Sequence, residues 1–428
     1  MSILKRYMPS KVKDFIYTCN YEDKDHLYFI CDLIYRRRNS IKSDLPYLHF
    51  TNIPREYFTN VISNWKVFNS DIQFLINNNV VDGDDLFIQG RKCKGYKIND
   101  KFISTIDSVT IDKRTLIKNI IKGVNTQKQT EHLKEYKKHF LKSFKINYKD
   151  AIEYVESLVV KDFYQIYNSY HPNTPLLPAT KTDLSYIQHM FESEPCADKK
   201  MTYGNLIEKY NYYRFSIEVI NDGDLFFKRN KTNLRIDTNL TSLKSDLKKF
   251  IIGAENLIQI DISNSQPTLL YFLIKNENIN KKEIQKYKEW VLSGKYYEKF
   301  IDEYYISTLK KIDRKKIKDI MFCIFYSKND SYKYDKEIFR KIFPSIMRWI
   351  ENQKVDKHNK LAIDLQKVES EIVIDTICKE LTEVEIKYYT IHDSWIVNKD
   401  NQEETVKIIK REFMNKYNEI PDLKISGL

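Results

Sequence analysis

The 428-residue chain has little glycine and little proline, with 9 and 10 residues respectively. It contains neither a GxxxxGK[ST] pattern nor a GxGxxG pattern. Both patterns need glycine so that main-chain amides can approach phosphate groups. P-loop nucleotide hydrolases and dinucleotide-binding enzymes are therefore disfavoured.

The sequence also lacks paired cysteines and long apolar runs. Its six cysteines include no CxxC pair, which argues against a zinc site or a disulfide framework and favours a reducing compartment. No apolar run approaches the roughly 18 residues of a membrane-spanning helix, and the N-terminus lacks the apolar core of a signal peptide. We therefore expect a cytoplasmic protein with no membrane partner.

What the chain has is basic charge, with 71 Lys and Arg residues against 59 Asp and Glu residues and a net charge of +12. The charge is uneven: residues 101–150 sum to +7 and residues 301–350 to +5, whereas residues 351–400 sum to −4. A hydrophobic fraction of 42% predicts a folded chain, and its length predicts two or three domains. The basic blocks indicate a polyanionic partner.

The first 105 residues are expected to form a winged-helix-like module. Helical patterns at 25–38 and 57–80 precede a predicted hairpin whose turn carries Arg91, Lys92 and Lys94. Such a module binds nucleic acid through a helix and a basic wing, although a unit that only packs fits the pattern equally well. Residues 106–230 are rich in Lys and are expected to be mostly helical.

Three motifs in the last 200 residues carry candidate chemistry. The first is DISNSQP, in which Asp261 follows the apolar run LIQI and precedes a helical pattern. A carboxylate at the end of a core strand is costly unless it meets a cation. By itself, Asp261 fits a helix cap equally well.

The second motif is the helical segment 314–326, in which Arg314, Lys318, Phe322 and Tyr326 recur every four residues. This spacing places them on one stripe, with two cations followed by two rings. The stripe suits a nucleotide, with its phosphates against the cations and its base and sugar against the rings. An ordinary amphipathic helix is the alternative.

The third motif is IHDS, a tight step between the predicted strands KYYTI and SWIVN. A hairpin here would bring Asp393 to the edge of a sheet beside another strand. Two carboxylates on neighbouring strands can hold two divalent ions about 4 Å apart. An Asp that only forms a β-turn is the alternative.

In this order, the three motifs resemble motifs A, B and C of family A DNA polymerases and of the related single-subunit phage-type RNA polymerases. The resemblance covers residues 231–428, and no proofreading exonuclease domain is visible. It implies an α+β right-hand polymerase fold, with an antiparallel palm sheet and helical fingers in 231–428. Residues 106–230 would then be a thumb-like region behind the N-terminal module (1–105).

The resemblance also implies roles for individual residues. Asp261, Asp393 and the main-chain carbonyl of Ile262 would bind two Mg²⁺ ions, with Mn²⁺ as a substitute. Nucleoside triphosphates would contact Arg314, Lys318, Phe322, Tyr326 and Gln266, with Lys318 also the acid for the leaving group. The DNA primer-template would contact Arg235, Gln366 and His392.

Two departures bear on the substrate. Gln266 stands where the DNA enzymes carry a Glu that excludes the ribose 2′-hydroxyl, and its similar size favours dNTPs. Ser394 is typical of the RNA enzymes. We therefore predict a DNA-directed DNA polymerase, with an RNA polymerase or primase-like enzyme as the first alternative. The other alternative is an inactive nucleic-acid-binding replication or defence factor. Small size and the missing exonuclease indicate a phage or mobile element, in a bacterial or phage-infected cell.

Overall fold

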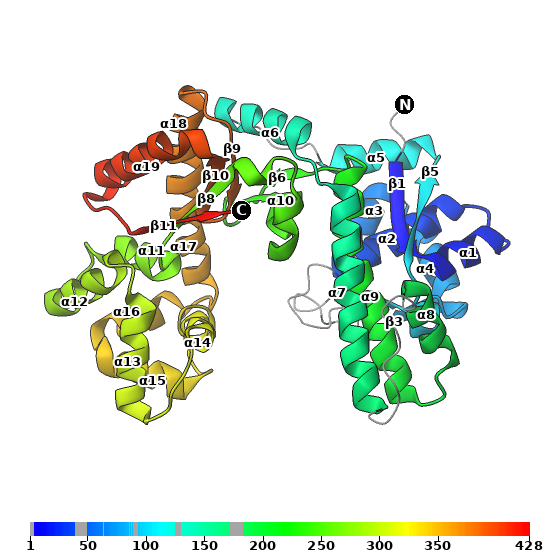
Figure 1. The fold of residues 1–428 in the computed structure, drawn as a ribbon, viewed down its shortest axis with the longest axis horizontal. Helices are drawn as coiled ribbons and strands as arrows, with labels where there is room; N and C mark the ends of the chain where they lie inside the picture. The colour runs from blue at the N-terminus through cyan, green and yellow to red at the C-terminus, as the bar shows by residue number, and fades with distance from the viewer. Residues whose placement is uncertain are drawn as a thin grey trace. The chain divides into compact units, whose positions relative to one another are not determined.

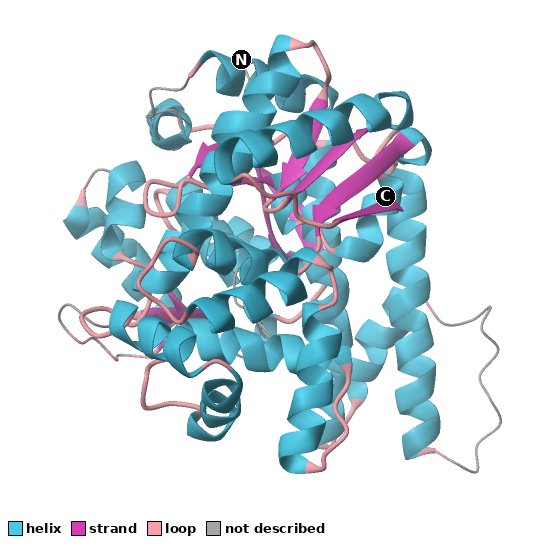
Figure 2. Ribbon diagram, turned by 90° about the vertical axis from the view of Figure 1, so that its left-hand side faces the viewer, coloured by secondary structure: helices cyan, strands magenta, loops and turns pink. Residues whose placement is uncertain are grey.

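The structure is a computed structural model in which the chain forms two compact units, each assembled from segments that are separate in the sequence (Figure 1). Both units are mostly helical and contain small antiparallel sheets (Figure 2). This confirms the expected combination of helices with antiparallel sheets, whereas the right-hand arrangement stays a prediction. The described residues are 4–38, 49–62, 64–84, 86, 88, 93–124, 130–171 and 183–428. Unit 1 takes the described residues of 1–128, 145–225 and 242–252, and unit 2 those of 129–144, 226–241 and 253–428.

Unit 1 contains two small sheets. Strand β1 (Leu4–Pro9) pairs antiparallel with β5 (Ile106–Ile111), while β4 (Gly95–Ile98) pairs with both β2 (Thr51–Asn52) and β3 (Val81–Gly83). The helices of unit 1 are α1 (Ser10–Thr18), α2 (Lys24–Arg38), α3 (Arg55–Ile62), α4 (Trp65–Asn77), α5 (Arg114–Val124), α7 (Tyr148–Tyr170), α8 (Leu184–Ser193) and α9 (Ala197–Asn221).

The predicted hairpin of the N-terminal module is formed by β3 and β4. Lys94, one of the three basic residues expected in its turn, is exposed just before β4. The other two, Arg91 and Lys92, lie outside the described residues.

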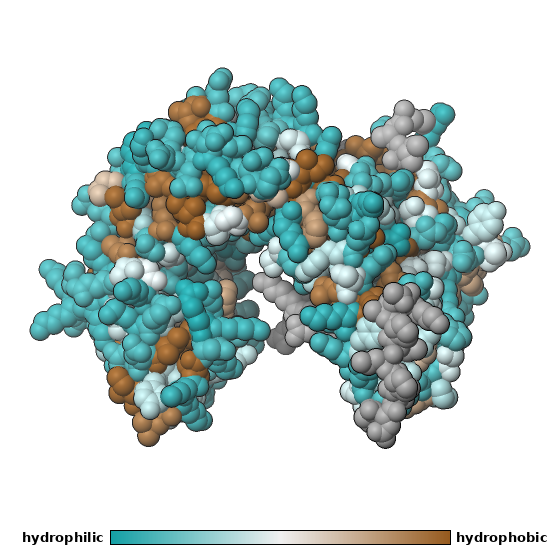
Figure 3. Space-filling model, viewed as in Figure 1, coloured by the Kyte–Doolittle hydropathy of each residue, from teal (hydrophilic) through white to brown (hydrophobic). Residues whose placement is uncertain are grey.

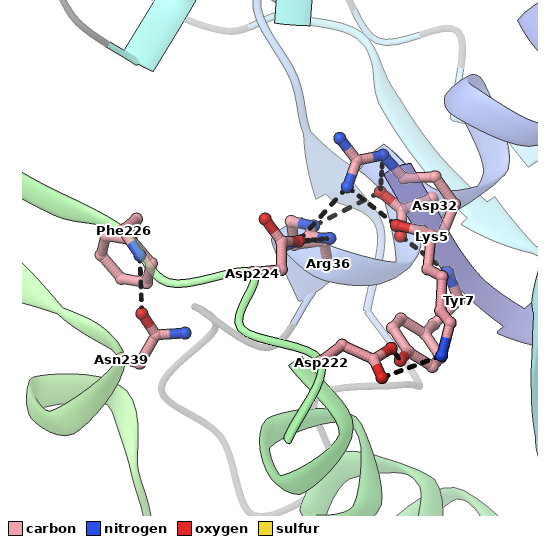
Figure 4. A network of polar contacts seen from close by, with 9 residues as sticks. Lys5, Tyr7, Asp32, Arg36, Asp222, Asp224, Phe226 and Asn239 are labelled. Carbon is pink, nitrogen blue, oxygen red and sulfur yellow. Dashed lines mark hydrogen bonds and ion pairs between the residues drawn. The ribbon is translucent and has the colours of Figure 1, made fainter. Parts of the chain in front are cut away.

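A polar network holds strand β1 within unit 1 (Figure 4). The main-chain N–H of Tyr7 donates to Asp32 on α2 at 3.0 Å. Arg36, one turn further along α2, pairs with Asp32 at 3.3 Å and with Asp224 at 3.1 Å. Lys5 pairs with Asp222, just beyond α9, at 2.9 Å. The network therefore ties β1, α2 and the end of α9 together.

Unit 2 is built on a four-stranded sheet with the strand order β11–β8–β10–β9, in which every pair is antiparallel. Its strands are β8 (Leu257–Ile262), β9 (Tyr388–Ile391), β10 (Ser394–Asn398) and β11 (Leu423–Gly427), with a separate hairpin of β6 (Phe227–Arg229) and β7 (Ile236–Thr238). Its helices are α6 (Glu131–Ser143), α11 (Ser265–Ile274), α12 (Lys281–Leu292), α13 (Tyr296–Thr308), α14 (Arg314–Tyr326), α15 (Lys333–Ile342), α16 (Pro344–Gln353), α17 (Lys360–Ser370), α18 (Cys378–Glu383) and α19 (Gln402–Tyr417). The short helix α10 (Asn239–Ser242) follows β7, and the π-helix η6 (Glu371–Ile377) joins α17 to α18.

Helix α6 belongs to unit 2, although it lies in the sequence among the helices of unit 1. The Tyr136 hydroxyl accepts a hydrogen bond from the main-chain N–H of Thr390 on β9 at 2.9 Å. The rings of Tyr136 and Tyr388 lie 4.7 Å apart. Helix α6 therefore packs against the edge strand of the four-stranded sheet.

The surface seen in Figure 3 is mostly hydrophilic, with scattered apolar patches. None of the described helices combines the length and apolar character needed to cross a membrane. All six cysteines are free thiols.

Candidate functional site

The side chains of β8 point alternately to the two faces of the strand, and Asp261 lies on the face turned away from the core. Ile258, Ile260 and Ile262 are buried on one face, so Gln259 and Asp261 share the other face. Asp261 therefore lies within a strand, and the N-cap position of the following helix α11 is Asn264.

Asp393 lies beside Asp261 at the end of the same ladder. Asp261 pairs with Ser394 across β8 and β10, and the main-chain N–H of Ile262 donates to the Asp393 carbonyl at 3.3 Å. Asp393 follows His392 in the two-residue turn between β9 and β10, and His392 adopts a left-handed φ of 51°. The hairpin thus brings the two predicted carboxylates to neighbouring strands.

The two carboxylates differ in their surroundings. Burial raises the pKa of Asp393, a hydrogen bond from Ser265 lowers it, and the charge of Asp261 raises it. The Gln259 amide donates to Asp261 at 2.7 Å and to Ser394 Oγ at 3.2 Å. Gln259 is a site residue that the sequence did not single out, although its position two residues before Asp261 on a strand is the signal for a shared face.

The donor set fits a hard divalent cation. Asp261 and Asp393 offer carboxylate oxygens, and the carbonyl of Ile262 is adjacent, all of which suit Mg²⁺. Buried Asn264 has no hydrogen-bond partner for its side-chain oxygen or nitrogen among the described residues. Within that same part of the chain, no group of three or more Asp, Glu, His or Cys residues is clustered for metal binding. Further ligands would have to be water or substrate oxygens, which is usual for Mg²⁺.

Helix α14 presents the predicted stripe on its exposed side. Arg314, Lys318 and Phe322 are exposed and Tyr326 is half-buried. The rings of Phe322 and Tyr326 lie 5.3 Å apart. The residues that pack α14 into unit 2 are Ile317, Ile320, Met321, Ile324 and Phe325. The helix is amphipathic, and its open face carries the cations and rings.

The cations of α14 lie over the ring of Tyr297 on α13. Arg314 and Lys318 are 5.3 Å and 5.6 Å from the ring centroid. Arg314 also pairs with exposed Glu298 at 2.9 Å. Arg314 is one of the two cations expected to bind phosphate, and in this structure it is already paired with an acid.

Lys318 lies within electrostatic reach of two cations, Arg314 and Lys424, and of two acids, Asp393 and Glu298. Its pKa is lowered by burial, by Arg314 and by Lys424, while Asp393 and Glu298 oppose the shift. Lys424 lies opposite Asp261 in the ladder of β8 and β11. Lys424 is thus a third cation near the carboxylates, and sequence reasoning did not identify it.

The C-terminal end of α14 is held by a buried lysine. Lys354 donates to the carbonyls of Ile324 at 2.7 Å and Ser327 at 3.2 Å. Burial lowers the pKa of Lys354 to about 8. Its ammonium group satisfies carbonyls that the end of a helix leaves without partners.

Two of the three predicted DNA-contacting residues, Arg235 and Gln366, lie near one another on or beside α17. Arg235 forms a bidentate pair with Glu369 on α17, at 2.7 Å for both hydrogen bonds. Gln366, one turn earlier on α17, accepts a hydrogen bond from Asn233 at 3.0 Å. The structure therefore brings Arg235 and Gln366 to the same end of α17, while His392 lies in the turn next to Asp393.

Electrostatic coupling connects these groups to the carboxylate pair. The charge of Asp393 raises the pKa of Lys318, of Tyr326 and of Glu369. The sheet end, the exposed stripe of α14 and the buried end of α17 therefore lie within electrostatic reach of one another.

Comparisons with known proteins find similarity among solved structures. No protein-family model matches the chain, and neither does any curated protein. Among solved structures, the chain is similar to the POL domain of Pol1 from M. smegmatis, in a complex with DNA primer-template and dNTP. The TM-score is 0.48 and the identity 12%, over 73% of this chain and 72% of that chain. A similarity at this level establishes neither a family nor an activity.

Proposed function

We propose that the chain is a template-directed nucleotidyltransferase, specifically a DNA-directed DNA polymerase that uses Mg²⁺ and lacks a proofreading exonuclease. The observation that carries the proposal is the adjacency of Asp261 and Asp393 within electrostatic reach of the exposed stripe of α14. An acidic pair beside two cations and two rings matches a substrate with a polyphosphate at one end and a base at the other.

In this proposal, Asp261, Asp393 and the Ile262 carbonyl hold the metal ions. When bound, Mg²⁺ supplies charge neutralisation and activation of the primer 3′-hydroxyl. Arg314 and Lys318 grip the phosphates. The lowered pKa of Lys318 makes its ammonium a better proton donor to the leaving pyrophosphate.

The remaining residues bind the base, the sugar and the DNA. Phe322 and Tyr326 offer ring surfaces to the nascent base pair. Gln266 borders the sugar, and its size favours dNTPs over rNTPs. Arg235, Gln366 and His392 border the primer-template.

Extension of a primed DNA template, with Mg²⁺ and either dNTPs or rNTPs, tests the proposal. The wild type should incorporate dNTPs, and Asp261→Ala and Asp393→Ala should each lose activity by about a thousandfold or more, as expected where charge stabilisation of the transition state is removed. Asp400→Ala is the control, because Asp400 is an exposed acid beyond the end of β10. Incorporation by Asp261→Ala at the wild-type rate would overturn the proposal.

The alternatives predict different results. Preferential rNTP incorporation would indicate an RNA polymerase or primase-like enzyme. DNA binding by the wild type without incorporation of either nucleotide would indicate an inactive nucleic-acid-binding factor.

A further inference from the structure

Glu369 is a buried carboxylate in the middle of the proposed site. It lies on α17 with 1% of its surface exposed, and it faces Arg235, which donates through Nε and a terminal nitrogen to the two carboxylate oxygens. Bidentate pairing of this kind fixes the plane of the guanidinium as well as its position. Glu369 therefore determines the orientation of Arg235.

The same carboxylate also orients Gln266 on α11. Gln266 donates from Nε2 to Glu369 at 3.0 Å, and its Oε1 accepts a hydrogen bond from the Tyr326 hydroxyl on α14. A carboxylate only accepts hydrogen bonds, so the amide nitrogen must face Glu369 and the oxygen must face Tyr326. The opposite orientation would place two acceptors against each other.

Stability alone does not account for this arrangement. Burial raises the pKa of Glu369 to about 7 despite the bidentate hydrogen bonds and the charge of Arg235, which lower it. Buried ion pairs often contribute less stability than apolar residues of similar volume. The network instead connects three residues that border the proposed substrates: Arg235, Gln266 and Tyr326.

We propose that Glu369 is a positioning residue for nucleotide binding: its carboxylate fixes Gln266, and through Gln266 the Tyr326 hydroxyl, in the orientation that receives the incoming nucleotide. The inference rests on the proposed polymerase function. Glu369 touches neither Asp261 nor Asp393 in any described hydrogen bond or ion pair, so its removal affects substrate affinity more than the chemical step.

The matched control is Asp375, which lies six residues further along the same helical run. It also forms a bidentate pair, with Arg229 on β6 at 2.6 Å for both hydrogen bonds. Asp375→Asn removes an ion pair of the same type that has no described contact with Gln266. Comparison of Glu369→Gln with Asp375→Asn therefore separates positioning from the general loss of an ion pair.

Steady-state primer extension with a varied dNTP concentration tests the inference. Glu369→Gln should raise KM about tenfold, as expected for weakened hydrogen bonds to a charged group, with a smaller change in kcat. Asp375→Asn should leave both constants close to the wild-type values. Tyr326→Phe combined with Glu369→Gln should raise KM by less than the product of the single effects, because both act through Gln266.

The outcomes separate the two proposals. If the wild type incorporates no nucleotide, the proposed function fails. If the wild type is active and Glu369→Gln keeps the wild-type KM, or lowers kcat alone, the positioning role is overturned while the function stands. Thermal unfolding of both variants shows whether a changed KM accompanies loss of the fold.

Discussion

Asp261 on β8 lies directly opposite Ser394 on β10, so Asp393, which precedes Ser394, stands at the end of the same ladder. The adjacency of the two carboxylates therefore depends on the register in which β8 pairs with β10. A one-residue slip of β10 would turn the strand over and exchange the faces of its side chains.

Replacement of Asp393 should separate stability from activity. Burial raises the pKa of Asp393, so the charged carboxylate destabilises the fold above that pKa, and the effect disappears as the carboxyl is protonated at lower pH. Asp393→Asn should therefore unfold at the same or a higher temperature than the wild type at neutral pH, while nucleotide incorporation is lost. Calorimetry beside primer extension measures both, and a variant that is both inactive and less stable would contradict the expectation.

Release of Arg314 should improve nucleotide binding. Glu298 holds Arg314 in an exposed ion pair, which is worth little to stability. Glu298→Ala should lower KM for the nucleotide by about two- to fivefold, the equivalent of a surface ion pair. Glu303→Ala is the matched control, because Glu303 on the same helix pairs with Lys286 at 3.1 Å. An equal change of KM in both variants would show that the Arg314 pair has no specific effect.

Lys354 should make the free energy of unfolding depend on pH in the alkaline range. Burial lowers its pKa from 10.5 to about 8, so the unfolded state binds the proton more tightly between these values. The unfolding free energy of the wild type should therefore rise relative to Lys354→Met as the pH increases from about 8 to 10.5. Urea unfolding measures this difference. Lys357→Met, at an exposed lysine, is the control for the loss of a lysine side chain.

Nucleotide binding should weaken as the pH falls through about 7. Glu369 is the group responsible, since burial raises its pKa to about 7, and the charges facing it are Arg235, which lowers the pKa, and Asp393, which raises it. Protonation weakens its hold on Arg235 and Gln266, so KM for the nucleotide should rise on the acid side. Glu369→Gln has no titratable group at this position. Its KM should therefore lose this pH dependence and keep only the part that Asp393 contributes. A parallel pH profile in both proteins would contradict the assignment.

Local patterns predicted the elements that carry the site. Four-residue spacing identified α14 and its exposed stripe, because helical geometry is fixed by positions close in sequence. The two-residue step at His392 identified the hairpin that brings Asp393 to the sheet. The roles assigned to these residues remain predictions that incorporation assays must decide.

Long-range contacts were beyond the sequence patterns. Gln366 and Glu369 lie one turn apart on α17, and only the contact of Glu369 with Arg235, 134 positions away, reveals its part in the site. Lys424 approaches Asp261 because β11 pairs with β8, and no local pattern specifies that partner. Helix α6 lies in the region 106–230, which was expected to be helical, and no sequence pattern indicated that it packs in unit 2 against a strand 254 residues later in the chain.

The position of α6 also has a consequence for biosynthesis. Its apolar face, formed by Leu133, Tyr136 and Phe140, is buried in the finished protein. A ribosome releases this helix well before it makes β9, so the part of the apolar face that β9 covers stays exposed while most of the remaining chain is translated. Uncovered apolar surface favours aggregation and chaperone binding. The nascent chain is therefore open to such binding between the synthesis of α6 and that of β9.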